Sequence, residues 1–341
     1  MKDQVENNFS KCLIIVGMHR SGTSFTASLL QKAGLNIGSD LLGTGVGNEL
    51  GHFENEDFLT FHKNVLLTKN QNPDGWSQNK IEHLNDQEQT DLLKIIQSNT
   101  TSQWGWKEPR TTLFLDIYKK IIPNAYYLFV YRNPWEVVDS LFRRSTDNEL
   151  LKSPLSTINN WEFYNKIVLD FYKNNIENSL LVDIETVMQK CNTVIELINS
   201  KFNFELIEIA DTLFEKEKFK NESTSIQQFY CEYAFPTSID LYKLLQTHSS
   251  ISPFKLYSPS NLNKESLIQW WRASSYLNKS NIDQPSEDII TKIITDIIEP
   301  LNNVNERLTK ENTYLKEDLN WITNSKWWKI RSFLKKFFSN S

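Results

Sequence analysis

The sequence has few cysteines, few glycines and no long hydrophobic run, and each shortage argues against a class of protein. Three cysteines in 341 residues, with no Cys-x-x-Cys pair, disfavour a disulfide scaffold, a zinc ribbon and a dithiol redox site. The five histidines include no pair spaced i, i+4, so we expect no bound metal. No apolar stretch approaches the roughly 20 residues of a membrane span. Residues 1–8 are polar and carry acids, unlike a signal peptide. These features predict a cytoplasmic protein.

The balance of charge argues against a general nucleic-acid partner. Lysine and arginine total 37 against 42 aspartate and glutamate, which gives a formal net charge of −5. A nucleic-acid-binding chain is usually basic over its contact surface. The chain is also long enough, at 39% hydrophobic residues, to bury a large core without disulfides or metals.

Short apolar runs alternate with segments of helical periodicity. Residues 12–16, 125–131 and 180–183 are apolar and of strand length, and residues 104–106 are a shorter strand candidate. Helical spacing follows each run. Alternation of this kind predicts an α/β fold with a parallel sheet flanked by helices.

The first strand leads into a loop that has the outline of a phosphate-binding loop. Residues 17–24 read Gly-Met-His-Arg-Ser-Gly-Thr-Ser and precede a predicted helix. Backbone N–H groups of such a loop bind phosphate oxygens at the helix N-terminus. A nucleoside triphosphatase would have lysine at the position of Thr23, where it neutralises the β- and γ-phosphates. Its absence, with Arg20 inside the loop, favours a ligand with a 5′-phosphate but no triphosphate chain.

A second phosphate contact is predicted at the end of the strand 125–131. Arg132 ends that strand, and Ser140 lies eight residues later on the next predicted helix. Charge from the arginine and a hydrogen bond from the serine could bind one phosphate from two sides.

These motifs resemble those of sulfotransferases. Residues 17–24 resemble the 5′-phosphosulfate loop of that family, and residues 131–140 (Tyr-Arg-Asn-Pro-Trp-Glu-Val-Val-Asp-Ser) resemble its 3′-phosphate motif. Residues 107–110 (Lys-Glu-Pro-Arg) resemble a Lys-Asp-Pro segment of the tyrosylprotein-type and many bacterial members. The resemblance covers residues 12–145 clearly and continues weakly to about 250. It implies the donor 3′-phosphoadenosine 5′-phosphosulfate, a P-loop-like fold and no metal.

The resemblance also implies roles for individual residues. Arg20 and Lys107 are the candidates for neutralising charge on the transferred sulfuryl group. The expected donor-binding residues are Gly17, His19, Arg20, Ser21, Gly22, Thr23, Ser24, Arg132 and Ser140.

The acceptor hydroxyl needs a general base, and several residues are candidates. An acidic residue shortly after the first helix has this role in the tyrosylprotein type, and Glu54 is the nearest match. Glu56 or Asp57 could take its place, although acids there could equally stabilise a helix N-terminus. The other candidates are His19, His52 and Glu108, with His19 expected instead to line the loop. Three tryptophans are expected in the core rather than as sugar platforms: Trp104, Trp106 and Trp135.

The C-terminal part has a different composition. We expect a catalytic domain over residues 1–250, a linker and helical segment over 251–300, and a charged helix with a basic tail over 301–341. Residues 326–338 carry five basic residues, no acid and a broad apolar face at helical spacing. That composition is typical of an interfacial helix, so contact with a membrane or with a partner is expected, with packing on the protein's own core as the alternative.

The function predicted is sulfuryl transfer from 3′-phosphoadenosine 5′-phosphosulfate to a hydroxyl. A carbohydrate acceptor, of a surface polysaccharide or glycolipid, is favoured because similar Trp- and Lys/Arg-rich ends occur on bacterial enzymes that build such polymers. The alternatives are a nucleotide kinase or other nucleoside-triphosphate-binding P-loop protein, and a non-catalytic nucleotide-binding scaffold.

Overall fold

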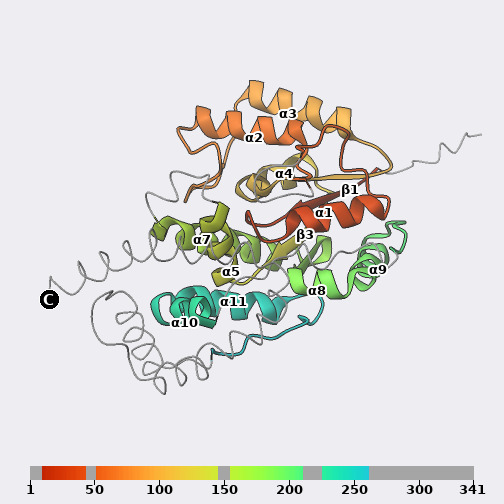
Figure 1. The fold of residues 1–341 in the computed structure, drawn as a ribbon. Coiled ribbons are helices and arrows are strands. Elements are labelled where there is room, and N and C mark those ends of the chain that lie inside the picture. The colour runs from red at the N-terminus through yellow and green to blue at the C-terminus, as the bar shows by residue number, and fades with distance from the viewer. Residues whose placement is uncertain (1–9, 44–50, 145–153, 210–224, 261–341) are drawn as a thin grey trace, which may run out of the picture. The chain divides into compact units, whose positions relative to one another are not determined.

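A computed structural model describes residues 10–43, 51–144, 154–209 and 225–260 of the chain. Over this part, four parallel strands form one sheet in the order β2-β1-β3-β4 (Figure 1). The strands are β1 Lys11–Val16, β2 Gln103–Lys107, β3 Tyr126–Tyr131 and β4 Ser179–Asp183. The predicted α/β class with a parallel sheet is therefore confirmed. The predicted C-terminal helical extension lies outside the described residues.

Helices connect the strands and cover the sheet. Their bounds are α1 Thr23–Lys32, α2 Glu56–Thr68, α3 Asp86–Asn99, α4 Leu115–Ile121, α5 Pro134–Arg144, α7 Pro154–Lys173, α8 Ile184–Gln189, α9 Cys191–Phe202, α10 Ser225–Ala234 and α11 Pro236–His248. Short 3-10 helices span η1 Pro109–Phe114 and η2 Ile176–Asn178. None of the described helices is long and apolar enough to cross a bilayer.

Each strand buries side chains on both faces, as expected for a parallel sheet covered by helices on both sides. On one face, Leu13 and Ile15 of β1 pack with Leu29 and Leu30 of α1 and with residues of α8 and α9. On the opposite face, Ile14 belongs to a larger cluster built from α2, α4, α5, α7 and α11. Successive side chains of β1 thus point to opposite faces of the sheet and enter two separate layers of the core.

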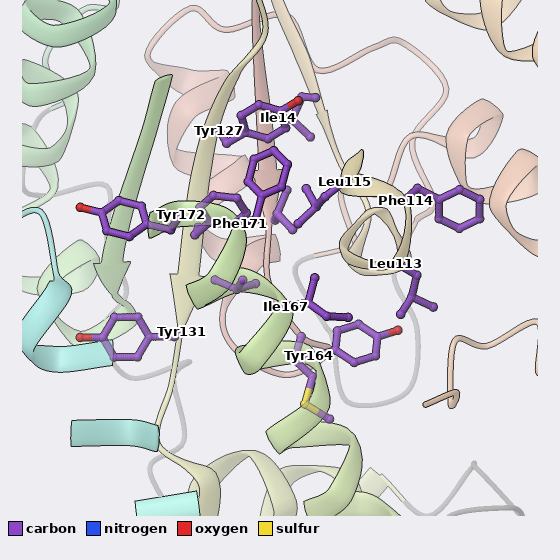
Figure 2. Close-up of a cluster of buried hydrophobic side chains, with 14 of the residues drawn as sticks. Ile14, Leu113, Phe114, Leu115, Tyr127, Tyr131, Tyr164, Ile167, Phe171 and Tyr172 are labelled. Atoms are coloured by element: carbon purple, nitrogen blue, oxygen red, sulfur yellow. The ribbon is translucent and has the colours of Figure 1, made fainter. Parts of the chain in front are cut away.

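The larger layer is rich in aromatic side chains. Figure 2 shows Ile167 and Phe171 of α7 beside the sheet, where Phe171 meets Tyr127 of β3 edge-on at 4.8 Å between ring centroids. Trp104 and Trp106 are 2% and 0% exposed in the same cluster. The expectation that these two tryptophans belong to the core is confirmed.

The strand order places a switch point next to β1. The chain passes from β1 to β2 on one side and then to β3 on the other side of β1. Ligands of open parallel sheets bind at such a point, outside the carboxyl ends of the strands. At those ends stand the residues that the sequence singled out: the loop from Gly17, Lys107, and Arg132.

Candidate active site

The loop between β1 and α1 adopts the tight conformation that a phosphate-binding loop requires. Arg20 and Gly22 both have positive φ angles, of 66° and 88°. A Cβ on Gly22 would lie 2.3 Å from Cδ1 of Ile184, at the start of α8. Glycine is therefore required there twice over, by conformation and by space. A non-glycine residue such as Arg20 in this region of backbone space is strained and is often found at functional sites.

The start of α1 fits an anionic group. Gly22 is the N-cap, no described side chain caps the helix, and its first turn carries no acid. The hydroxyl of Ser21 is buried and makes no hydrogen bond within the described part of the chain. A helix N-terminus without a cap attracts negative charge, and the Ser21 hydroxyl can donate to an oxygen placed there.

The two predicted phosphate-binding motifs meet at one place in the fold. Nε of Arg20 donates a hydrogen bond to Oγ of Ser140 at 2.8 Å, across a separation of 120 residues. Nη1 of Arg132 lies 3.4 Å from the backbone carbonyl of Arg20. The loop after β1 and the segment after β3 therefore present their polar side chains to a common site. Sequence alone does not give this juxtaposition, because it depends on β1 and β3 being neighbours.

The second motif is held rigidly. The side chain of Asn133 accepts from the backbone N–H of Glu136 at 2.9 Å in the first turn of α5. Nε of Arg132 donates to Glu136 at 2.7 Å, and Trp161 of α7 donates to the Arg132 carbonyl at 3.1 Å. Arg132 and Ser140 are 7% and 4% exposed.

At the end of β2, Lys107 pairs with Glu54. Nζ of Lys107 donates to Oε1 of Glu54 at 3.0 Å, and the two side chains are 1% and 9% exposed. Burial lowers the pKa of Lys107, an effect that the charge of Glu54 opposes. The structure therefore joins the predicted sulfuryl-neutralising lysine to the nearest predicted base.

The neighbouring acids, Glu56 and Asp57, have surroundings that differ from those of the buried Glu54. Asn55 is the N-cap of α2 and accepts from the N–H groups of Asp57 and Phe58. Glu56 and Asp57 are exposed in the first turn of that helix, and Asp57 accepts from Asn99 at 3.0 Å. The capping role weighed for this acidic cluster thus belongs to Asn55, with the two exposed acids beside it.

Behind Lys107 and Glu54 lies a buried network of charges. Arg110 forms an ion pair with Glu108, and Nδ1 of His62 lies 2.6 Å from the other oxygen of Glu108. Nε2 of His62 lies 2.8 Å from the Tyr118 hydroxyl. Burial would raise the pKa of Glu108, but Arg110 and the hydrogen bond from His62 outweigh it and lower this pKa to about 2. Glu108, one of the candidate bases, therefore sits as a fully buried ion between two partners, an environment that favours a structural role.

His19, in the loop after β1, lies near this network. Its ring centroid is 4.8 Å from that of Trp76 and 6.4 Å from that of Tyr164. Its charge, when protonated, is one of those that lower the pKa of Glu108. His52, the remaining candidate base, is half-buried, and its backbone N–H bonds to carbonyls of the segment 42–43.

Several residues of the site were not assigned a role from the sequence. Arg110 belongs to the motif 107–110 but has no predicted function there, and its charge two residues after Glu108 was the available signal. His62 and Tyr118 are polar positions on apolar helix faces, a pattern with no specific meaning in a sequence. Trp76 lies in a connecting segment. No cluster of metal-ligating side chains occurs among the described residues.

No protein-family model and no curated protein matches the chain. Among solved structures, a sulfotransferase from Alicyclobacillus acidocaldarius shares 15% identity over 72% of this chain and 98% of its own, with a TM-score of 0.44. The sulfotransferase domain of the Synechococcus PCC 7002 olefin synthase shares 17% identity over 84% of this chain and 99% of its own, with a TM-score of 0.35. The sulfotransferase domain from the curacin biosynthetic pathway shares 13% identity over 85% of this chain and 98% of its own, with a TM-score of 0.34.

Proposed function

We propose that the chain is a sulfotransferase that moves a sulfuryl group from 3′-phosphoadenosine 5′-phosphosulfate to a hydroxyl. The observation that carries the proposal is the hydrogen bond from Arg20 to Ser140, which supports one site for the predicted 5′-phosphosulfate loop and the predicted 3′-phosphate contact. A donor with phosphates at both ends of its ribose requires two such contacts. The orphan hydroxyl of Ser21 supports the same ligand.

The proposed reaction divides between two groups of residues. The loop after β1 would hold the 5′ end of the donor, while Arg132 and Ser140 hold the 3′-phosphate. A bond forms between the acceptor oxygen and sulfur while the bond from sulfur to the bridging oxygen breaks. Arg20 and Lys107 neutralise the developing charge, and Glu54 takes the proton of the acceptor hydroxyl.

This chemistry requires Lys107 to exchange partners. In the structure, Nζ of Lys107 donates to Glu54. When the lysine turns to the sulfuryl oxygens, that oxygen of Glu54 becomes available to the acceptor hydroxyl. We expect Glu54→Gln to lower kcat by about 10²–10⁴-fold with little change in donor affinity. Full activity of Glu54→Gln with a verified acceptor would move the base to His19 or His52.

The rival function is a kinase or another protein that binds a nucleoside triphosphate. Thr23 at the position of the usual lysine argues against it. Calorimetric titration of the full chain distinguishes the two: 3′,5′-adenosine bisphosphate should bind without metal, and ATP with Mg²⁺ should bind weakly or not at all. Tight binding of Mg²⁺-ATP with no binding of the bisphosphate would overturn the proposal. A scaffold without catalysis would bind the bisphosphate but show no turnover of labelled donor.

For the acceptor, we propose a carbohydrate hydroxyl. The support is the composition of residues 326–338, which resembles the ends of bacterial enzymes that build surface polysaccharides. Panels of polysaccharide, glycolipid, peptide and phenol acceptors with labelled donor test the choice. Label transferred only to peptide or phenol would contradict it.

The same tail is proposed to bind a membrane surface peripherally. The six side chains of its apolar face would enter the interface while its basic residues meet anionic headgroups. These six are Trp327, Ile330, Phe333, Leu334, Phe337 and Phe338. Deletion of residues 324–341 should abolish co-sedimentation with anionic liposomes and leave bisphosphate binding intact. If the intact chain ignores liposomes and the truncated chain aggregates, the tail packs on the protein instead.

A further inference from the structure

The carboxylate of Glu54 has a different cation near each of its oxygens. Lys107 lies 3.0 Å from Oε1, and Nη1 of Arg110 lies 4.0 Å from Oε2. Lys107 is 1% exposed and Arg110 is 6% exposed at their side chains. In the proposed reaction, Lys107 moves away from Glu54 and Arg110 does not. Glu54 would then keep one cation, on the oxygen that does not face the lysine.

Arg110 is itself fixed by several partners. The same Nη1 forms the ion pair with Glu108. Nε donates to the carbonyl of Pro73 at 2.8 Å, and Nη2 lies 3.4 Å from a carboxylate oxygen of Asp74. Nη1 is therefore shared between Glu108 and Glu54, while Asp74 and the carbonyl of Pro73 hold the rest of the guanidinium.

The position of Glu108 depends on His62 and Tyr118. Burial lowers the pKa of His62 and raises the pKa of the Tyr118 phenol well above its usual value. A neutral His62 that donates from Nδ1 to Glu108 and accepts the phenol proton at Nε2 satisfies all three groups. Because His62 is neutral, Arg110 is the charge that balances Glu108.

We infer that Arg110 is a positioning residue for Glu54: it holds this carboxylate ionised and in place when Lys107 turns to the sulfuryl group, and Glu108 limits how strongly it does so. The inference rests on the proposed function, because only there does Lys107 leave Glu54. The charged and titratable groups that face Glu54 are Lys107 at the end of β2, Arg110 in η1 and His62 in α2.

Two substitutions in the network should shift the proton affinity of Glu54 in opposite directions. Arg110→Met removes the cation 4.0 Å from Oε2 and should move the titration of Glu54 to higher pH. Glu108→Gln leaves Arg110 with one carboxylate fewer and should lower it. Merely loosening the network would move both variants the same way, so the opposite signs identify an electrostatic role.

The measurement is a titration of the full chain labelled with ¹³C at glutamate Cδ, with the Glu54 signal assigned by its loss in Glu54→Gln. Because Arg110→Met alone leaves Glu108 buried and unbalanced, Arg110→Met/Glu108→Gln provides a second, neutral variant. Its Glu54 signal should titrate above that of the parent chain but below that of Arg110→Met, since the loss of the cation is partly offset by the loss of the like charge of Glu108. Lys80→Met breaks an exposed ion pair with Asp116 and should leave Glu54 unchanged.

An unchanged Glu54 pKa in both Arg110 variants, or shifts of the same sign in Arg110→Met and Glu108→Gln, would overturn the inference. The acid limb of kcat/KM should follow the NMR titration. The titration decides the role of Arg110, and turnover of labelled donor decides the proposed function. The two proposals can therefore fail separately.

Discussion

The two halves of the site handle charge differently. In the half at the ends of β1 and β3, Arg20 donates to a hydroxyl and Arg132 to a backbone carbonyl and to Glu136 on the next helical turn. In the half at the end of β2, Lys107 and Arg110 are closed against buried carboxylates. Hydroxyl and carbonyl contacts can be exchanged for phosphate oxygens at little cost. Opening a buried ion pair costs more, because each charge then loses a close counter-charge. We therefore expect the first half to govern donor affinity and the second to govern stability and rate.

The largest effect should come from opening the buried half. Glu108→Ala removes the carboxylate that balances Arg110 and is expected to cost about 3–5 kcal/mol of unfolding free energy. Asp116→Ala, which breaks an exposed pair with Lys80, should cost no more than about 1 kcal/mol. Urea denaturation of both variants at neutral pH makes the comparison. Similar losses in the two would show that the buried network does not stabilise the fold more than a surface ion pair.

The next effect concerns rate. Lys107→Met should lower kcat by about 10²–10³-fold, the usual result of removing one group that stabilises transition-state charge. Its bisphosphate affinity should stay near that of the parent chain, because Lys107 lies outside the proposed phosphate contacts. Steady-state kinetics and calorimetry on the same preparation separate the two quantities. Loss of bisphosphate affinity with unchanged kcat would place Lys107 in the donor half instead.

A smaller effect is expected from Asp183, which ends β4 and feels the charges of Glu136 and Glu185. Burial raises the pKa of Asp183 to about 7, against a hydrogen bond from the N–H of Thr186 that lowers it. Since the folded chain holds this proton more tightly than the unfolded chain, stability should fall as pH rises from about 4 to about 7. Asn at this position keeps an N-cap acceptor and carries no charge.

Asp183→Asn should therefore flatten this part of the pH dependence. At about 1.4 kcal/mol per pKa unit, the gain at pH 8 relative to pH 4 is roughly 2–4 kcal/mol. Thermal and urea unfolding across this pH range measure it. A variant that is less stable than the parent chain at pH 8 would show that the ionised carboxylate is needed as a cap.

How far the sequence could predict the site also differs between the halves. The loop 17–24 and the segment 131–140 are contiguous motifs, so the donor half could be predicted residue by residue once strands were recognised on either side. The buried half is assembled from segments far apart: Glu54 before α2, His62 within it, and Arg110 after β2. No local spacing links them, because they meet only through the packing of α2 and η1 on the sheet.

The fold shows the same limit. Runs of apolar residues predicted β1, β3 and β4, since strands covered on both faces are apolar throughout. The strand order was not predictable. A buried strand is apolar whichever strand it pairs with, so the apolar runs do not show that β2 and β3 are the neighbours of β1. The sequence after residue 210 gave no clear prediction of α10 and α11. Yet α11 buries Ile239, Leu241, Tyr242 and Leu245.

The smallest effects should come from the donor half, residue by residue. Arg132→Ala should weaken bisphosphate binding by about 1.5–3 kcal/mol, the range for a hydrogen bond to a charged group, and Ser140→Ala by about 0.5–1.5 kcal/mol. Raising the salt concentration should weaken bisphosphate binding equally in the parent chain and in Ser140→Ala. The effect of salt should be smaller in Arg132→Ala, because this variant has lost one charge that neutralises a phosphate.

Glu136→Gln is the matched control for this half. Glu136 bonds Nε of Arg132 and competes with a phosphate for it. Its neutral analogue should therefore bind the bisphosphate as tightly as the parent chain or more tightly, whereas the other two substitutions weaken binding. Calorimetry on all three variants measures the differences. If Glu136→Gln weakens binding as much as Arg132→Ala does, then Glu136 orients the guanidinium rather than competing for it, and the contacts of Arg132 would be as fixed as those of the buried half.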